Sequence, residues 1–302
     1  MKTLVIANPV SGHGRAAEVV PQLLEALAAW GVEAEAVFTT ADTRPGALED
    51  AILGAEIAVA VGGDGTVNRV IQAVVLGQTP ERPGPAVAIV PAGTGNVAAR
   101  AFGFPGEVSR AARIIAGGAS TAVDAGLVVR DGRVQAAFLL WLGAGLDGAL
   151  IHAIARRRSP FRGMRLIVEY FLEGPRTLWR YPFPRMRLET ESLSGDFATV
   201  MLANVGRLAI GSVTTRADPT DGQFDVVAIP PRSRAAWCFA CLMAGLNVPD
   251  RCPGIVRSRA TRMRLSAGGQ LPVQIDGEPL GYLPVEVEVR PAALRLVAAP
   301  RP

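Results

Sequence analysis

Lysine is almost absent from this chain. Of its 31 basic residues only Lys2 is a lysine, and the others are arginines. Nucleotide-binding loops that end in Gly-Lys-Ser or Gly-Lys-Thr, and the protein-kinase fold, both need a lysine in the body of the chain. The sequence excludes both. A protein of this composition that handles phosphate does so with backbone N–H groups, arginine and metal ions.

Long apolar runs are missing as well. No segment reaches the ~18 uncharged apolar residues of a membrane-spanning helix, since the longest runs, 136–146 and 235–248, are shorter. The opening residues MKTLVIANPV are typical of a strand rather than of a secretory leader. We therefore expect a cytoplasmic protein.

Cysteine is scarce, with three residues in 302. Cys238 and Cys241 are spaced as C-x-x-C within the apolar run AAWCFACLMAGL, but no second Cys or His pair follows, so the pattern does not favour zinc. We expect both to be small, buried apolar side chains of a helix.

The pattern of strand-like and helix-like runs changes near residue 124. Up to about residue 124, strand-like and helix-like runs alternate, which predicts an α/β domain with a parallel sheet. From residue 125 to 302, alternating runs and a hairpin turn at Asp131-Gly132 predict an antiparallel β domain of β-sandwich type, interrupted by helices near 148–178 and 233–247. The last strand is a candidate to return to the first domain.

Three glycine-rich turns mark strand-to-helix junctions of the first half: NPVSGHGRA, GGDGTVN and PAGTGNVA. In a parallel sheet such turns share the carboxyl edge of the strands, where open α/β folds bind ligands. Glycines allow a phosphate to approach the backbone, and the following helix N-terminus favours an anion. The three turns together predict a phosphate-binding edge.

Asp64 lies within the second of these turns. A carboxylate beside phosphates repels them unless a cation lies between, or unless it accepts a hydrogen bond from a hydroxyl. The Mg²⁺ that accompanies a nucleotide is the usual cation in such a position.

In this order and spacing, NPVSG, VGGDGTVNRV and PAGTGNVAA resemble the diacylglycerol kinase catalytic-domain family, which includes bacterial soluble diacylglycerol kinases, sphingosine kinases and ceramide kinases. DPTDGQFDVVAI resembles the family's D-G-x-hydrophobic-D element, and IDGEPL resembles its D-G-E element. The resemblance therefore covers nearly the whole chain. G-G-D-G-T alone also occurs in NAD kinases and, as a variant, in phosphofructokinases.

The resemblance implies a lipid kinase with an active site in the cleft between an NAD kinase/phosphofructokinase-like α/β domain and a lipid-binding β domain. It implies that ATP contacts Asn8, Pro9, Ser11, Gly12, Thr40, Gly62, Gly63, Asp64, Gly65, Thr66, Asn68, Gly93, Thr94 and Asn96. It also implies a structural Mg²⁺ at Asp221, helped by the carbonyls of Asp218 and Gln223. One departure is Val97, where bacterial diacylglycerol kinases often carry Asp; sphingosine and ceramide kinases have an apolar residue there.

Phosphoryl transfer to an alcohol needs a group that takes the hydroxyl proton. The two histidines, His13 and His152, are weaker candidates than the carboxylates of QIDGEPLG. On local sequence, Asp276-Gly277 is typical of a simple hairpin turn. With the resemblance, we expect Asp276 to be the base, with Glu278 as its neighbour or substitute and Asp64 as the catalytic carboxylate of the nucleotide site.

The basic charge is concentrated in the second half. Residues 1–150 carry a net charge of −4 and residues 151–302 a net charge of +8. Nine arginines between Arg156 and Arg187, among aliphatic and aromatic residues, fit an anionic membrane surface. The same pattern occurs in solvated helix faces and in nucleic-acid patches. On the resemblance we expect transient attachment to the inner membrane surface and no nucleic-acid partner. The sequence does not decide whether the chain forms a homodimer.

The favoured hypothesis is a two-domain kinase that transfers the γ-phosphate of ATP to the hydroxyl of a diacylglycerol or sphingoid lipid. One alternative is an NAD kinase-like or other small-molecule kinase. The other is a catalytically silent regulator that binds nucleotide or lipid, against which the intact GGDGT, DGQFD and IDGE motifs argue.

Overall fold

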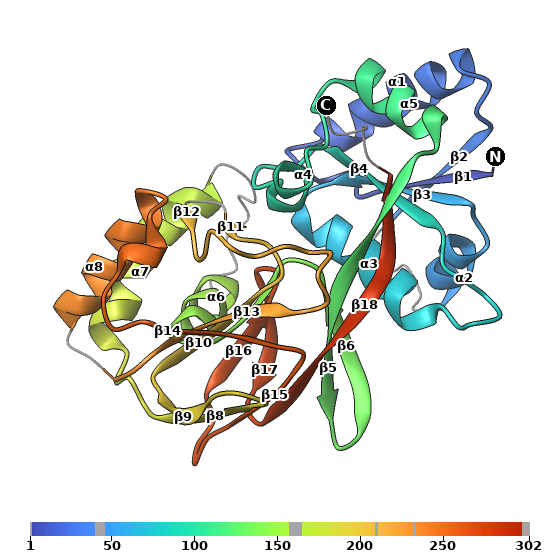
Figure 1. The fold of residues 1–302 in the computed structure, drawn as a ribbon. Coiled ribbons are helices and arrows are strands. Elements are labelled where there is room, and N and C mark those ends of the chain that lie inside the picture. Colours follow the sequence, from blue (N-terminus) through green and yellow to red (C-terminus); the bar gives the residue numbers. More distant parts are fainter. Residues whose placement is uncertain (1, 40–45, 157–164, 209–210, 232–233, 298–302) are drawn as a thin grey trace. The chain divides into compact units, whose positions relative to one another are not determined.

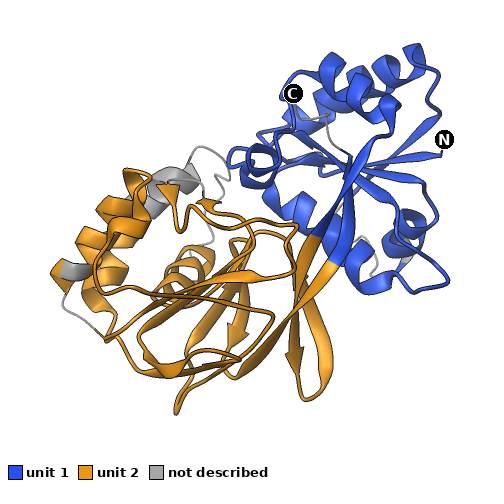
Figure 2. Ribbon diagram, in the orientation of Figure 1, with its two compact units in different colours: residues 1–123, 161–166, 292–302 blue, residues 124–160, 167–291 orange. Residues whose placement is uncertain are grey.

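The computed structural model describes residues 2–39, 46–156, 165–208, 211–231 and 234–297 (Figure 1). The chain forms two compact units (Figure 2). Unit 1 consists mainly of residues 1–123 and 292–302, and unit 2 mainly of residues 124–160 and 167–291.

Unit 1 is an α/β domain around a parallel sheet. Its strands are β1 (Thr3–Ala7), β2 (Ala34–Phe38), β3 (Ile57–Gly62) and β4 (Ala86–Pro91). Its helices are α1 (Arg15–Ala29), α2 (Ala47–Leu53), α3 (Asp64–Gly77), α4 (Val97–Ala101) and α5 (Val108–Gly117). The strands run in the order β2-β1-β3-β4, and all pairs are parallel.

Apolar periodicity explains these elements. Every residue of β1 and β3 is buried, as expected for strands covered on both faces. In α1 the buried residues Val19, Val20, Leu23 and Leu27 follow helical spacing. Helices α1 and α5 pack together, as do α2 and α3, and Figure 1 shows the two pairs on opposite faces of the sheet.

Unit 2 is mainly antiparallel β structure. Its strands are β5 (Ser120–Arg130, which begins in unit 1), β6 (Arg133–Phe138), β7 (Trp141–Gly145), β8 (Met186–Thr190), β9 (Ser194–Phe197), β10 (Thr199–Ala203), β11 (Arg207–Leu208), β12 (Gly211–Ser212), β13 (Phe224–Ile229), β14 (Val256–Ala260), β15 (Arg262–Ser266), β16 (Pro272–Ile275), β17 (Glu278–Tyr282) and β18 (Val285–Val297). Its helices are α6 (Leu146–Arg156), α7 (Arg165–Arg180), α8 (Arg234–Gly245) and the 3₁₀ turn η1 (Pro249–Arg251).

Two antiparallel layers enclose the core of unit 2. One is the six-stranded sheet β14-β13-β10-β7-β16-β17, and the other contains β18-β15-β8-β9. A single apolar core takes side chains from both layers, among them Phe224 and Val273 from the first and Met263 and Val287 from the second. This arrangement is the expected sandwich.

Two strands carry residues of both units. Strand β5 passes from unit 1 into unit 2 at Asp124, and then forms a hairpin with β6 through the turn at Asp131-Gly132. Strand β18 pairs antiparallel with β15 in unit 2, while Arg295 and Leu296 near its end pair in parallel with β4 in unit 1.

The fold class and the Asp131-Gly132 hairpin are confirmed, but the expectation for the cysteines is wrong. Cys238 and Cys241 are exposed. Trp237, on the same helix α8, is buried instead. Within the described residues, no helix has the length and apolarity to cross a membrane.

Candidate active site

The structure brings the three glycine turns together at the carboxyl edge of unit 1. They follow β1, β3 and β4, which are neighbours in the sheet. Gly12, with a φ of 60°, lies so close to the third turn that a Cβ atom there would be 1.9 Å from the carbonyl oxygen of Ala92. The first turn therefore requires glycine for both its conformation and its packing.

The second and third turns also touch. A Cβ on Gly93 would lie 2.3 Å from Cα of Gly63. The backbone N–H groups of Ala92 and Gly93 both donate to the carbonyl oxygen of Gly62, at 2.9 and 3.1 Å. The three turns thus form one continuous glycine-lined surface, defined here as the glycine cradle: residues 8–14, 62–66 and 91–96.

Asn96 fixes the shape of the third turn. Its side-chain amide donates to the carbonyl oxygen of Gly93 at 2.7 Å, and its Oδ1 accepts from the backbone N–H of Gly93 at 3.0 Å. Asn96 itself adopts a left-handed conformation with a φ of 48°. Asparagine tolerates that region better than most residues, which explains an asparagine here.

Two long helices begin at the cradle. Gly14 precedes α1 and Gly63 precedes α3, and neither helix start receives a side-chain cap. Ser11 lies in the first of the three glycine turns. The buried Thr66 lies near the N-terminus of α3. Glycine caps leave helix N-terminal amides close to any bound anion.

Asp64 has a structural partner that the sequence did not reveal. Its Oδ1 accepts a hydrogen bond from the backbone N–H of Ala98 at 3.1 Å, which ties the start of α3 to α4. Burial raises the pKa of the Asp64 carboxyl, while the Ala98 amide and the charge of Arg100 act in the opposite direction. The carboxylate therefore connects the second cradle turn to the helix that follows the third.

The other predicted nucleotide contacts lie on or beside the cradle. Asn8 accepts at Oδ1 from the N–H of Val10 at 3.2 Å, and Pro9 follows it in the same turn. Gly65 and Asn68 lie on α3, and the half-buried Thr94 lies in the third turn. Thr40 falls outside the described residues.

Asp276 is held in the turn between β16 and β17. Both central residues of this turn, Asp276 and Gly277, have positive φ, as a type I′ hairpin requires. The Asp276 side chain is only 7% exposed. Its two oxygens accept the backbone N–H groups of Leu139, Leu140 and Trp141 at 2.8, 2.8 and 3.0 Å. This carboxylate fixes the segment before β7 to the turn.

Glu278 follows the turn as the first residue of β17, and its side chain is exposed. Both predicted base candidates therefore belong to one rigid hairpin in unit 2, but they face different surroundings. Asp276 lies among backbone amides, whereas Glu278 is exposed.

Sequence reasoning missed two residues behind this hairpin. Gln274, fully buried on β16, accepts at Oε1 from the N–H of Gly277 at 2.8 Å and donates from Nε2 to the Asp147 carboxylate at 2.7 Å. Asp147 comes from the first turn of α6, more than a hundred residues away along the chain. No local motif marks either residue.

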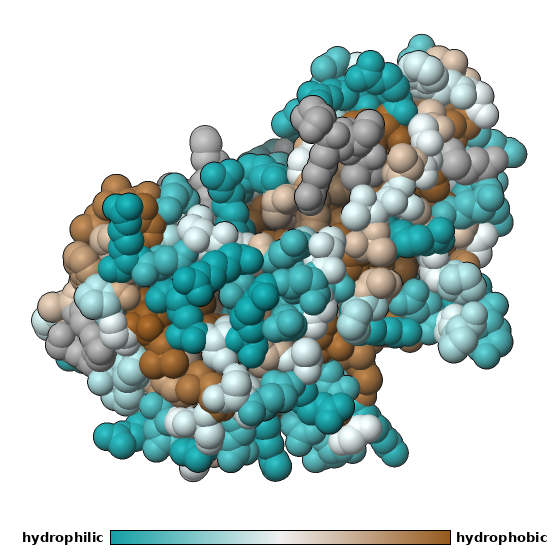
Figure 3. All heavy atoms as spheres, in the orientation of Figure 1, coloured by the Kyte–Doolittle hydropathy of each residue, from teal (hydrophilic) through white to brown (hydrophobic). Residues whose placement is uncertain are grey.

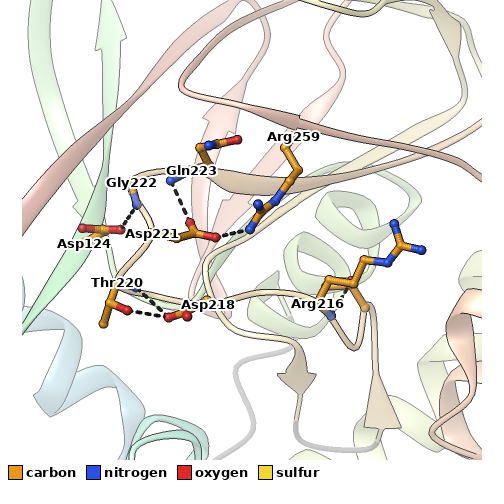
Figure 4. Close-up of polar contacts among 9 residues, drawn as sticks. Asp124, Arg216, Asp218, Thr220, Asp221, Gly222, Gln223 and Arg259 are labelled. Carbon is orange, nitrogen blue, oxygen red and sulfur yellow. Dashed lines mark hydrogen bonds and ion pairs between the residues drawn. The ribbon is translucent and has the colours of Figure 1, made fainter.

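The residues predicted to bind Mg²⁺ share one loop before β13 (Figure 4). Asp218 accepts from the N–H and hydroxyl of Thr220 at 3.0 and 2.7 Å. Asp221 accepts from the N–H of Gln223 at 3.0 Å through Oδ1, and forms an ion pair with Arg259 through Oδ2.

In this loop Arg259 supplies the positive charge beside the Asp221 carboxylate, where the resemblance implies a divalent ion. Among the residues that the structure describes, no three acidic, His or Cys side chains are grouped to hold a metal. The neighbouring Asp225 is buried, and burial raises the pKa of its carboxyl while Arg259 lowers it. The magnesium site at Asp221, Asp218 and Gln223 stays a prediction.

Two family models match the chain. Residues 2–128 match the diacylglycerol kinase catalytic domain, and residues 142–298 match the YegS C-terminal NAD kinase beta sandwich-like domain. Among curated proteins, the diacylglycerol kinase of Mycobacterium tuberculosis (strain H37Rv) is 28% identical, over 98% of this chain and 94% of the relative. That of Bacillus subtilis (strain 168) is 26% identical, over 93% and 91%.

A solved structure shares the fold. The crystal structure of a diacylglycerol kinase from Bacillus anthracis str. Sterne superposes with a TM-score of 0.75 at 21% identity, covering 99% of this chain and 97% of the other. This likeness agrees with an α/β unit followed by a β-sandwich unit.

Proposed function

The chain belongs to the diacylglycerol kinase catalytic-domain family, a family of lipid kinases, and we propose that it transfers the γ-phosphate of ATP to the hydroxyl of a membrane lipid of diacylglycerol or sphingoid type. The observation that carries the proposal is the glycine cradle. Three turns on neighbouring parallel strands approach one another so closely that Gly12 and Gly93 cannot bear side chains. Such a surface suits a triphosphate.

In the proposed complex, the cradle amides and the N-termini of α1 and α3 hold the phosphates. Mg²⁺ that arrives with the nucleotide neutralises phosphate charge. Through its bond to Ala98, Asp64 holds the second turn against α4, the helix that follows the third turn. Positioning and charge stabilisation of this kind supply most of the catalysis in phosphoryl transfer.

The proton acceptor in this proposal is Glu278 rather than Asp276. The sequence put Asp276 first, but its oxygens accept three backbone N–H groups in a buried site. Glu278 is exposed on the same hairpin. As the bond between the lipid oxygen and the γ-phosphorus forms, the hydroxyl proton passes to Glu278 and the bond from the γ-phosphorus to the leaving oxygen of ADP breaks.

The test is transfer of labelled γ-phosphate from ATP to diacylglycerol, sphingosine and ceramide in mixed micelles, with NAD as a soluble acceptor. Glu278→Gln should lower kcat by ~10²–10⁴-fold, the usual contribution of a general base. Its melting temperature should stay at the wild-type value. Asp276→Asn is the matched variant: it should lower the melting temperature, because it removes the charge that three buried amides share.

Three results would overturn parts of this proposal. Phosphorylation of NAD and not of lipid would make the chain a small-molecule kinase. ATP binding without transfer to any acceptor would make it a nucleotide-binding regulator. Near-normal kcat in Glu278→Gln, together with loss of kcat and unchanged stability in Asp276→Asn, would return the base to Asp276.

A further inference from the structure

Helix α7 exposes large apolar side chains where a helix of a globular unit would be polar. Leu172 and Trp179 are seven residues apart, which places them on one side of the helix. Trp179 is 74% exposed. Arg176 lies between them on the same side and is also exposed.

Helix α8 shows the same pattern more strongly. Phe239, Leu242 and Leu246 lie at helical spacing on α8 and directly after its end, and all three are exposed, Leu246 by 61%. Of the ten large apolar side chains that are exposed in the described residues, five belong to these two segments. Figure 3 shows brown surface at the left of the view, where Figure 1 draws α7 and α8.

The two helices are joined in unit 2. Arg234, at the start of α8, donates from Nε and a terminal nitrogen to the carbonyl oxygen of Trp179 at 3.2 and 3.0 Å. Its guanidinium also lies 5.3 Å from the Trp179 ring centroid. Behind this contact Phe183 stacks on the buried Trp237 at 5.7 Å. We define the α7–α8 face as the exposed side chains of these two joined helices: Leu172, Trp179, Arg234, Phe239, Leu242 and Leu246.

The two segments that carry this face are positively charged. Arg176, Arg180, Arg185 and Arg234 are exposed. Residues 172–185 and 234–248 contain a single acid, Glu173, which is buried and paired with Arg176 at 3.0 Å. By contrast Arg187, at the end of the arginine-rich run of the sequence, lies on β8 among Glu189, Asp196 and Ser194.

We propose that the α7–α8 face docks the protein on an anionic lipid bilayer, with its apolar side chains at the acyl boundary and its arginines at the phosphates. Amphipathic helices bind membranes through this pairing of apolar area and positive charge. Tryptophan is favoured at the membrane interface. A second copy fits less well, because a two-fold contact between identical faces would bring their arginines together.

The face also deepens the proposed function, since a lipid substrate is presented at a membrane surface. Its test measures binding rather than phosphate transfer, so the two proposals can fail separately. Vesicles of phosphatidylglycerol and phosphatidylcholine are compared with vesicles of phosphatidylcholine alone by co-sedimentation. Phe239→Gln/Leu242→Gln and, separately, Arg180→Gln/Arg234→Gln should each lower the bound fraction on anionic vesicles at least tenfold.

The matched control is Leu76→Gln/Val134→Gln, two exposed apolar residues of α3 and β6 outside the face. It should bind like the wild type. The proposal would be overturned if the control and the face variants lost the same bound fraction. It would also be overturned if the wild type bound anionic and neutral vesicles equally. Transfer to a short-chain lipid dissolved below its aggregation limit should persist in the face variants; loss of transfer there without loss of vesicle binding would also overturn it.

Trp179 provides a direct probe of the docked state. Lipids brominated on their acyl chains should quench part of the tryptophan fluorescence in the wild type and in Trp30→Phe, but much less in Trp179→Phe. Equal quenching in the two variants would show that another surface touches the bilayer. A stable dimer in sedimentation velocity that protects Trp179 from a soluble quencher would assign the face to a second copy instead.

Discussion

The amide of Gln274 joins the Asp147 carboxylate, 2.7 Å away, to the backbone of Gly277, 2.8 Å away. Gly143 leaves room for this pair, because a Cβ there would lie 1.8 Å from Asp147 Oδ2. The side chains thereby form a bridge from the start of α6 to the hairpin that carries Glu278. A carboxylate in such a place makes the stability of unit 2 depend on pH.

Burial raises the pKa of Asp147 from 3.8 to about 6, although the Gln274 hydrogen bond acts to lower it. At a pH between these two pKa values, the Asp147 carboxyl is protonated in the folded chain and ionised in the unfolded chain. The free energy of unfolding therefore falls as pH rises from about 4 to about 6, and then levels off. The total loss is roughly 3 kcal/mol for a shift of this size.

Asp147→Asn removes this titration while it keeps an acceptor for Gln274. Urea unfolding at several pH values should show the wild type losing stability relative to the variant between pH 4 and 6. Parallel curves for the two proteins across that range would contradict the shift.

The cradle predicts a sharp difference between two glycines. Gly93→Ala should weaken ATP binding at least tenfold, because its Cβ would meet Cα of Gly63 and push the second and third turns apart. Gly106→Ala is the control, since a Cβ there meets nothing within 4 Å. Titration calorimetry with ATP measures both. Equal affinities would show that the close approach of the turns is not needed for binding.

Substitution of Asp64 is expected to affect phosphate transfer more than the stability of the fold. Asp64→Asn keeps an oxygen for the Ala98 amide but loses the charge, so the melting temperature should change little. Transfer should fall by ~10²-fold or more, because the variant loses the charge that the sequence predicts to lie beside the Mg²⁺ of the nucleotide and so to help position the reacting phosphate. Asp64→Ala loses the bond as well and should also melt earlier. Near-normal kcat in Asp64→Asn would remove the carboxylate from the active site.

The ion pair between Asp221 and Arg259 predicts little dependence of stability on metal. Without nucleotide, the melting temperature should be the same in excess Mg²⁺ and in chelator, because a guanidinium already balances the Asp221 charge. Arg259→Gln should lower it in chelator, and Mg²⁺ should restore part of the loss if the vacated carboxylate then attracts a cation. Strong stabilisation of the wild type by Mg²⁺, abolished in Asp221→Asn, would instead establish the metal site that the family resemblance implies.

Local patterns determined the element types and the cradle. Apolar runs that end in Gly12, Gly62-Gly63 and Gly93 predicted parallel strands with phosphate-binding turns, since period and turn chemistry are properties of a few neighbouring residues. The Asp131-Gly132 hairpin follows for the same reason. ATP binding by the cradle stays a prediction. The sequence predicts that the three turns share the carboxyl edge of one sheet, whereas the structure shows that their strands are neighbours.

The burial and the partners of each polar side chain depend on the tertiary structure alone. Asp276 and Glu278 are two residues apart, yet one is enclosed by the amides of Leu139 to Trp141 and the other is exposed. The bridge from Asp147 through Gln274 and the ion pair of Asp221 with Arg259 join segments far apart along the chain. The exposure of Cys238 and Cys241 likewise depends on what packs against α8. Burial and pairing depend on how such segments pack, and no local period encodes that.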